Sequence, residues 1–389
     1  MNDDSFFTLS VHAGEDRSSN FGALSIPIYP ASVFAFSEAD DGVAIHNFEK
    51  PGYFYGRFGN PTQAALENAM AEIEAGESAL ALASGMAAIS AAVFTLAKSG
   101  DHIVAPESMY STTTNLLHHL KKQFDIETTF IDAANAESYA DAIRPNTKIL
   151  WIESPSNPLV RITDIKAVTA IGTRAGIATV VDNTFATPYN QRPLELGADL
   201  VIHSATKYLG GHSDLTAGII VGRKEMVEAA RHGAAKFYGG NIAPQVAWLV
   251  LRGIKTLALR MERHNSNASV LANIFAERLG ANAVYYPGLE SHQNFEIARR
   301  QMRGFGGILS VDVGNADAAK AFVNKVKICT FATSLGGVET LVQPVALMAH
   351  ATLSAEDRAT AGVSDGLLRI SVGIESVNDI WQDICNALS

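Results

Sequence analysis

Between residues 79 and 221, short apolar segments alternate with longer stretches that have helical spacing. The apolar segments predict seven strands, at residues 79–83, 102–105, 128–131, 148–152, 178–182, 200–203 and 218–221. Regular alternation of this kind is typical of a mostly parallel sheet with helices on both faces. The pattern therefore predicts an α/β fold built on one seven-stranded sheet.

Helical patterns flank this region on both sides. The first begins at Pro61, where a missing backbone N–H costs nothing, and ends at Gly76. A much longer pattern, at residues 245–279, is expected to form one helix that bridges two domains. Beyond it, predicted strands at 307–313 and 367–372 mix with helices, which indicates a smaller C-terminal α+β domain.

The first sixty residues predict irregular structure, because prolines and glycines punctuate them. Aromatic residues are frequent near the end of this segment. A long arm of this kind is ordered only when it packs against something, and a neighbouring subunit is a natural candidate. We therefore expect an arm over residues 1–60 that contacts a neighbour, a large domain over 61–250 and a C-terminal domain over 251–389.

Composition narrows the classes of partner. Of the 389 residues, 47% are hydrophobic and 18% are charged, which is an ordinary globular composition, and the length suggests two domains. A net charge of −10 without any basic run argues against nucleic acid as a partner. The uncharged stretch at 79–97 is almost long enough to span a membrane, but Ser84-Gly85 interrupts it. We interpret it as a buried strand, a turn and a buried helix, and expect no membrane association.

The two cysteines, Cys329 and Cys385, form neither a CxxC pair nor a metal-ligand spacing. We therefore expect no disulfide framework and no metal site. Few cysteines fit a reduced, cytoplasmic compartment. Acidic residues follow Met1 where a secretory signal would carry basic ones.

Lys207 is the first candidate for chemistry, in the tetrapeptide Ser204-Ala-Thr-Lys207 after a predicted buried strand. A lysine at such a strand end can lose solvation, which lowers its pKa and makes it nucleophilic enough to form a Schiff base with an aldehyde cofactor. The hydroxyls of Ser204 and Thr206 are close enough in sequence to bind a phosphate beside it. The tetrapeptide alone fits a solvated lysine equally well.

Two further signals lie at strand ends. Asp182 ends the predicted strand at 178–182, and an acid there could keep a pyridine nitrogen protonated; a helix N-cap is the alternative role. Ser84-Gly85 opens a helix, where small residues let an anion approach unpaired backbone N–H groups. Many strand–turn–helix units carry the same pair, so this signal alone is weak.

Together with other motifs, these residues resemble the Cys/Met-metabolism PLP-dependent enzymes, which have the aspartate-aminotransferase fold (fold type I). The shared motifs are spread over nearly the whole chain: Tyr53-Phe-Tyr-Gly-Arg-Phe-Gly-Asn-Pro-Thr62, Ser84-Gly-Met-Ala87, Glu153-Ser-Pro-Ser-Asn-Pro158, Val181-Asp-Asn-Thr184, Ser204-Ala-Thr-Lys207, Arg252-Gly-Ile-Lys-Thr256, Ser334-Leu-Gly-Gly337 and Arg369-Ile-Ser-Val-Gly-Ile-Glu375. The resemblance implies pyridoxal 5'-phosphate (PLP) as cofactor. It also implies carbon–sulfur lyase or γ-substituent transferase activity in cysteine and methionine metabolism.

The resemblance assigns a role to each matching residue. Lys207 would hold PLP and move protons, Asp182 would pair with the pyridinium nitrogen, and Tyr110 would stack on the ring and assist the leaving group. Further cofactor contacts would come from Gly85, Met86, Asn157, Thr184, Ser204 and Thr206, and from Tyr55 and Arg57 of a neighbouring subunit. The substrate would contact Asn157, Thr333, Ser334 and Arg369, the last of which would bind its α-carboxylate. The active unit would then be a dimer, assembled further into a homotetramer.

Two positions leave the substrate open within the family. Thr112 stands where methionine γ-lyases often carry a cysteine, and Thr333 stands where cystathionine enzymes often carry a glutamate. We expect γ-replacement or γ-elimination on a homoserine ester, cystathionine or a related thioether, as in a cystathionine γ-synthase or γ-lyase. The alternatives are a methionine γ-lyase or O-acylhomoserine sulfhydrylase and, more remotely, a PLP-binding protein without turnover. An aminotransferase shares the fold, but the Tyr55–Arg57 motif argues against it.

Overall fold

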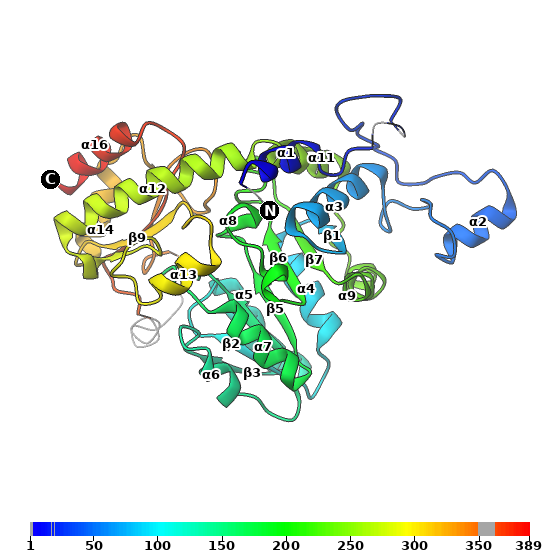
Figure 1. Cartoon of the computed structure of the whole chain (residues 1–389), viewed down its shortest axis with the longest axis horizontal. Helices are drawn as coiled ribbons and strands as arrows, with labels where there is room; N and C mark the ends of the chain where they lie inside the picture. The colour runs from blue at the N-terminus through cyan, green and yellow to red at the C-terminus, as the bar shows by residue number, and fades with distance from the viewer. Residues whose placement is uncertain (1–2, 17, 19, 349–361) are drawn as a thin grey trace.

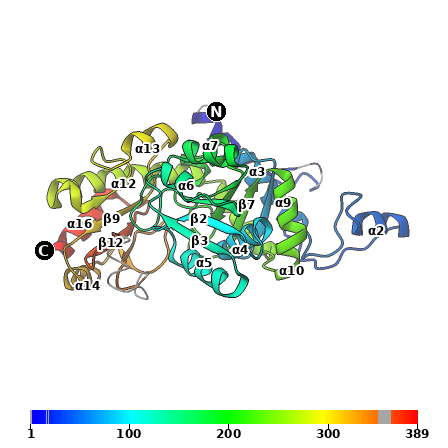
Figure 2. The same cartoon turned by 90° about the horizontal axis from the view of Figure 1, so that it is seen from below.

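The computed structural model describes residues 3–16, 18, 20–348 and 362–389. Figure 1 shows two sheets side by side along the long axis of the molecule. An N-terminal arm, residues 20–58, extends away from both sheets, and Figure 2 shows the same projection from below. The long helix α12 (Leu257–Leu279) runs from the larger sheet across the smaller one.

The larger sheet has seven strands. They are β1 (Ser78–Leu82), β2 (His102–Pro106), β3 (Glu127–Ile131), β4 (Thr147–Glu153), β5 (Ala178–Asp182), β6 (Leu200–Ser204) and β7 (Gly218–Gly222). Their order is β1-β7-β6-β5-β4-β2-β3, and all neighbours are parallel except β7, which runs antiparallel to β1 and β6. The prediction of a mostly parallel seven-stranded sheet is confirmed.

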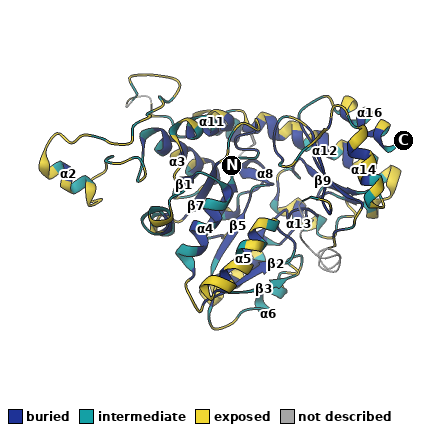
Figure 3. Ribbon diagram, turned by 180° about the vertical axis from the view of Figure 1, so that it is seen from behind, coloured by how far each residue is buried: buried dark blue, intermediate teal, exposed yellow. Residues whose placement is uncertain are grey.

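Helices cover both faces of this sheet. They are α3 (Pro61–Glu74), α4 (Gly85–Leu96), α5 (Ser111–Phe124), α6 (Glu137–Asp141), α7 (Ile165–Ala175), α8 (Thr187–Asn190), α9 (Lys224–Ala230), α10 (Lys236–Tyr238) and α11 (Pro244–Ile254), with short turns η1 (Pro193–Leu196) and η2 (Arg231–Ala235). One face packs against α3, α7 and α11, and the other against α4, α5 and α9. Alternate residues of each strand point to opposite faces of the sheet. In β7, Val221 packs in the layer of α3 and α11, and Ile220 packs in the layer of α4, α5 and α9. Figure 3 shows the buried residues concentrated between these layers.

The second sheet is smaller and mostly antiparallel. Its strands are β8 (Val284–Tyr285), β9 (Ile308–Asp312), β10 (Thr330–Phe331), β11 (Leu341–Pro344) and β12 (Leu367–Ser371), in the order β10-β11-β12-β9-β8. Its core is closed by α12, α14 (Ala316–Lys325) and α16 (Val377–Leu388), while α13 (Phe295–Gln301) and the turn η3 (Ala281–Ala283) lie nearby in the chain. The expected smaller α+β part at the C-terminal end is present.

The expected single helix at 245–279 is wrong: it is two helices, α11 and α12, separated at Lys255 and Thr256. The carbonyl of Gly253 accepts hydrogen bonds from the side chains of Thr256 (3.2 Å) and Arg260 (2.7 Å). Gly253 also lies so close to Leu209 that a Cβ atom would be 2.4 Å from the Leu209 carbonyl oxygen. These tertiary contacts turn the chain where the sequence pattern alone continues.

The expectation of an irregular arm is also wrong in part, because the first sixty residues contain α1 (Asp3–His12) and α2 (Ala39–His46). Helix α1 packs on the body through Phe6, whose ring meets that of Tyr189 edge to face at 5.4 Å. Lys255 fixes its end by donating to the Val11 carbonyl at 2.6 Å. Residues 79–97 form β1, a turn and α4 as expected, and no helix in the described ranges is long and apolar enough to cross a membrane.

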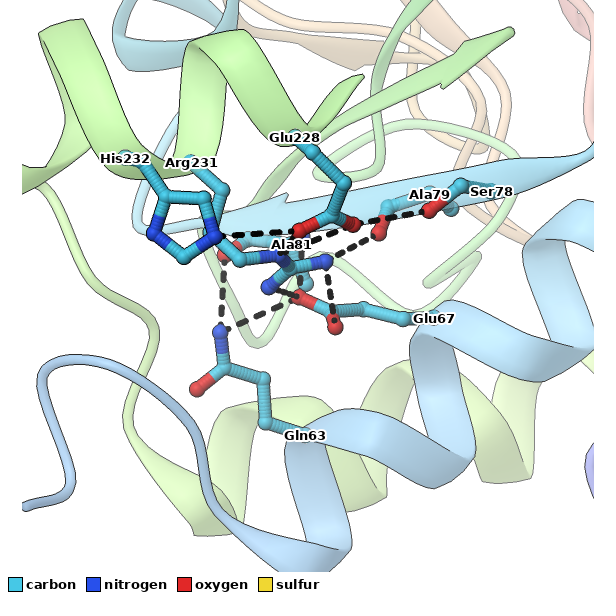
Figure 4. Close-up of polar contacts among 8 residues, drawn as sticks. All are labelled: Gln63, Glu67, Ser78, Ala79, Ala81, Glu228, Arg231 and His232. Atoms are coloured by element: carbon cyan, nitrogen blue, oxygen red, sulfur yellow. Dashed lines mark hydrogen bonds and ion pairs between the residues drawn. The ribbon is translucent and has the colours of Figure 1, made fainter. Parts of the chain in front are cut away.

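The arm turns back onto the body beside an ionic cluster that joins α3, β1, α9 and η2 (Figure 4). Arg231 pairs with Glu67 at 3.0 Å and with Glu228 at 3.2 Å, and donates to the Ala79 carbonyl at 2.7 Å. Burial works against the charge of Arg231, but the two carboxylates raise its pKa overall. Next to it, the centroids of the His232 ring and of the Phe48 ring of the arm are 4.3 Å apart, so the arm contacts the body beside this cluster.

Candidate active site

A cavity of about 460 Å³ opens at the carboxyl ends of the parallel strands, facing the second sheet. This is the position at which open α/β sheets bind ligands. The predicted site residues that line it are Gly85, Met86, Tyr110, Asn157, Asp182, Thr184, Ser204, Thr206, Lys207, Thr333, Ser334 and Arg369. A hollow of about 580 Å³ beside α2 is larger, but only residues of the arm line it and no predicted site residue is among them.

Lys207 follows β6 and lies inside this cavity. Its Nζ donates a hydrogen bond to the Ser334 hydroxyl at 2.7 Å. Burial, and after it the charge of Arg369, lowers the pKa of Lys207 to about 8. Ser334 is held at a φ of 80°, a strained conformation for a residue other than glycine, and such strain is concentrated at functional sites.

Two carboxylates form the floor of the cavity. Asp182 and Glu153 end neighbouring parallel strands and are paired in register. Burial raises the pKa of each, and the charge of Asp182 raises the pKa of Glu153 further. The Asp182 carboxylate accepts the Thr184 backbone N–H at 3.0 Å, which favours its charged form.

An anion-binding cradle lies at the start of α4. Ser84 caps the helix by accepting the Ala87 N–H, so the N–H groups of Gly85 and Met86 precede the first hydrogen bond of the helix. A Cβ atom at Gly85 would come within 2.8 Å of the Ser204 side chain. Only glycine allows the helix and β6 to approach this closely, and the free N–H groups at the start of the helix could bind a phosphate group.

Arg369, on β12 of the second sheet, closes the cavity from the opposite side. Its guanidinium donates to the Asn157 side-chain oxygen (3.0 Å), the Gln343 side-chain oxygen (2.7 Å) and the Ser334 carbonyl (2.8 Å). All three acceptors are neutral, and within the described residues its Nε atom has no hydrogen-bond partner. Burial lowers the pKa of Arg369 to about 10, so it remains charged at neutral pH and can bind an anion.

Tyr110 and Thr112 lie at the start of α5, and Thr333 precedes the strained Ser334; all three line the cavity. The Tyr110 backbone N–H donates to Glu153, which the sequence reasoning had not selected. Gln343 was also missed. For Glu153 the available signal was a charged residue that ends an apolar strand, as Asp182 does, whereas nothing local distinguishes Gln343.

Tyr55 and Arg57 do not reach the cavity of their own chain. Arg57 lies on the arm, where it donates to the Lys236 carbonyl at 2.9 Å and stacks on the Phe58 ring at 4.4 Å. The Tyr55 side chain is 44% exposed. The expectation that these two residues serve a neighbouring subunit therefore stays a prediction.

The residues present fit PLP. The cavity combines an anion cradle, a desolvated lysine, an acid at a strand end and an arginine with an unsatisfied buried Nε. A family model described as Cys/Met metabolism PLP-dependent enzyme matches residues 7–389. The chain belongs to this family. PLP is its cofactor, and the prediction of the family and of its fold is confirmed.

Relatives within the Cys/Met family extend over the full chain. The chain is 43% identical to an L-methionine gamma-lyase of Fusobacterium nucleatum subsp. nucleatum, covering 97% of this chain and 96% of the relative. It is 44% identical to a cystathionine gamma-lyase of Bacillus subtilis, covering 98% of each. Among solved structures, a cystathionine gamma synthase from Xanthomonas oryzae pv. oryzae superposes with a TM-score of 0.92 at 40% identity, covering 98% and 97%.

Proposed function

We propose that this chain catalyses PLP-dependent γ-elimination or γ-replacement on an amino acid of sulfur metabolism: cystathionine, a homoserine ester or a related thioether. The observation that carries the proposal is the convergence of Lys207, Asp182 and Arg369 on one cavity, from the segment after β6, the end of β5 and the strand β12. Family membership and relatives that include a cystathionine gamma-lyase and a methionine gamma-lyase support it.

The cavity would hold PLP with its phosphate at the start of α4, near Ser204 and Thr206. Bound PLP supplies an electron sink that stabilises negative charge on the substrate. Asp182 would keep the pyridine nitrogen protonated, and Lys207 would hold the cofactor through its side-chain amine. Tyr110 would stack on the ring from the start of α5.

The substrate would lie between Lys207 and Arg369. Arg369 would bind its α-carboxylate, with Asn157 and Ser334 beside it. The Lys207 amine would remove the Cα proton, pass it on to the cofactor and so, neutral again, remove a Cβ proton. The γ-substituent would leave with its bonding electrons as Tyr110 assists. A nucleophile then adds at Cγ, or hydrolysis releases a 2-oxo acid and ammonia.

The main competitor is a methionine γ-lyase. Thr333 is uncharged, so it offers no carboxylate to the distal amino group of cystathionine. This favours a thioether without such a group, for example methionine. Incubation of the purified enzyme with cystathionine, methionine and O-acylhomoserines, with and without cysteine, separates these reactions by their products. Oxo acid and ammonia from methionine would favour the competitor, and absence of turnover with every substrate would contradict the proposal.

We further propose that the active unit is a dimer within a homotetramer, in the cytoplasm. Both cysteines are free, as expected for a reducing compartment. The projecting arm carries exposed apolar side chains such as Val33 and Val43. Contact with a second copy of the chain would remove these side chains from water, which supports a subunit interface here.

A shared site predicts complementation between inactive variants. Mixed Lys207→Ala and Arg57→Ala proteins should recover up to about a quarter of wild-type activity, because half of the dimers are hybrids with one intact site each. The measurement is turnover after subunit exchange, with exchange verified by native mass spectrometry. Each variant alone is the control, and hybrids that form without any activity would exclude a shared site.

Thr333 predicts weak recognition of the distal amino group of cystathionine. A carboxylate facing that ammonium contributes about 1.5–3 kcal/mol, which is about ten- to a hundredfold in specificity. Thr333→Glu should therefore shift kcat/KM towards cystathionine relative to an uncharged thioether of similar length. A wild-type preference for cystathionine above about a hundredfold, unchanged by the substitution, would show that another group performs this recognition.

The lowered pKa of Lys207 predicts how reconstitution depends on pH. Only the neutral amine attacks an aldehyde, so the rate at which apoprotein binds PLP covalently should rise through about pH 8 and then level off. Arg369→Met removes a like charge and should move this midpoint upward. Stopped-flow absorbance measures the rate, and a wild-type midpoint near pH 10 would mean that the lysine is solvated.

A further inference from the structure

Glu153 occupies the centre of the cavity floor without a role in the proposed chemistry. It ends β4, is buried, and accepts hydrogen bonds from two backbone N–H groups on different sides of the cavity. One oxygen accepts the Asn157 N–H at 2.8 Å and the Tyr110 N–H at 3.1 Å, and the other accepts the same Tyr110 N–H at 2.9 Å. The carboxylate thus joins the start of α5 to the loop after β4.

The connection continues to the second sheet. The side-chain oxygen of Asn157 accepts a hydrogen bond from Arg369 at 3.0 Å, and Gln343 accepts another from the same guanidinium at 2.7 Å. A continuous series of hydrogen bonds therefore runs from Tyr110 through Glu153 and Asn157 to Arg369. Its two ends are the residues proposed to stack on PLP and to bind the substrate carboxylate.

We infer that Glu153 is a positioning residue that sets Tyr110 and, through Asn157, Arg369 in their relative places for catalysis. This inference rests on the proposed function of those residues. When ionised, the carboxylate accepts at both oxygens and its negative charge strengthens these bonds. Burial and the charge of Asp182 raise the pKa of Glu153 to about 8, and the two backbone N–H donors act in the opposite direction. An amide would place an NH2 group against one of the two N–H donors.

The Glu153 carboxylate is buried at a position where a charge is unfavourable, which indicates a functional reason for an acid here. Glu153 stands next to Asp182, and burial raises the pKa of both, so a second negative charge here opposes folding. A neutral side chain would avoid that cost. The two backbone donors favour the ionised form of Glu153.

Two substitutions separate the bonds. In Glu153→Gln the amide oxygen can keep the bond from Asn157 and the longer contact with the Tyr110 N–H (3.1 Å), while the NH2 group replaces the oxygen that accepts this N–H at 2.9 Å. We expect kcat to fall about tenfold with KM changed by less than about twofold. Glu153→Met has a similar size and accepts neither bond, so kcat should fall about a hundredfold and KM should rise about tenfold.

The matched control is Asp383→Asn. Asp383 is also a buried carboxylate that accepts backbone N–H groups, those of Lys327, Ile328 and Cys329, each at 2.8 Å, but it lies in the second sheet's core region away from the cavity. The Asp383→Asn substitution should lower the unfolding temperature and leave kcat, KM and the circular dichroism of bound PLP unchanged. Both Glu153 variants should alter that visible band, because it reports how the ring of PLP sits in its site.

Amide hydrogen exchange checks the bonds without any cofactor. Glu153→Met should expose the amides of Tyr110 and Asn157, and Glu153→Gln should lower the protection of the Tyr110 amide alone, by less than Glu153→Met does. The inference is overturned if both variants lose only stability, as Asp383→Asn does. It is also overturned if Glu153→Gln is as inactive as Glu153→Met with unchanged KM and dichroism, because Glu153 would then act on the reacting atoms. A wild-type protein without the PLP band would instead contradict the proposed function, and exchange would still test the two bonds.

Discussion

Replacement of Lys207 by alanine is expected to abolish turnover and to remove the visible absorption band of covalently bound PLP. Covalent attachment of the cofactor and both proton transfers depend on the same amine, and the proton transfers alone contribute about 10²–10⁴ in rate. Activity should therefore fall at least about a thousandfold. Among the described residues that line the cavity there is no other lysine, so none of them can take over the amine's role.

Borohydride reduction and peptide mapping measure the attachment directly. In the wild type the reduced cofactor should be found on the peptide that contains Lys207. Lys224 is a suitable control, because it is exposed at the start of α9, and Lys224→Ala should keep both colour and activity. If Lys207→Ala kept the band, or if the label mapped to another lysine, the assignment of Lys207 would be wrong.

Replacement of Arg369 by methionine is expected to have the second largest effect. Its guanidinium is buried and, within the described residues, donates to neutral oxygens of Asn157, Ser334 and Gln343, so its charge is left for the substrate carboxylate. Loss of one partner of a buried charge pair costs about 2–5 kcal/mol. This corresponds to a loss of about 30- to 5000-fold in kcat/KM, carried mainly by KM.

A second substitution tests the charge argument while the arginine remains. Gln343→Glu would place a carboxylate in contact with Arg369 and neutralise it, so KM should rise about ten- to a hundredfold with a smaller change in kcat. Steady-state kinetics with the best substrate of the panel measures both variants. An unchanged KM in Arg369→Met would show that another group binds the α-carboxylate.

The larger sheet and most of the residues that line the cavity could be predicted from local sequence patterns. Strands such as β5 and β6 are short apolar runs with polar ends, and that signal lies entirely within a few consecutive residues. Lys207, Asp182 and Ser84-Gly85 follow such strands directly. Because parallel strands end at one edge of a sheet, their convergence in one cavity followed from local pattern alone.

The break between two helices and the N-terminal helix could not be predicted from local sequence, because both depend on contacts with residues far away in the chain. The break between α11 and α12 comes from contacts of Gly253 with Leu209 and with the Arg260 side chain. Helix α1 escaped prediction because its apolar face acquires a partner only when Phe6 meets Tyr189.

The same reason separates the two classes of site residue. The hydrogen-bonded residues Glu153 and Tyr110 are 43 positions apart in the sequence, and Arg369 and Asn157 are 212 apart. A hydrogen bond between such residues leaves no periodic mark in either segment, since each side chain is compatible with its strand whether or not the partner is present. The second sheet contributes Arg369 and Gln343 to the cavity only once it has packed against the first.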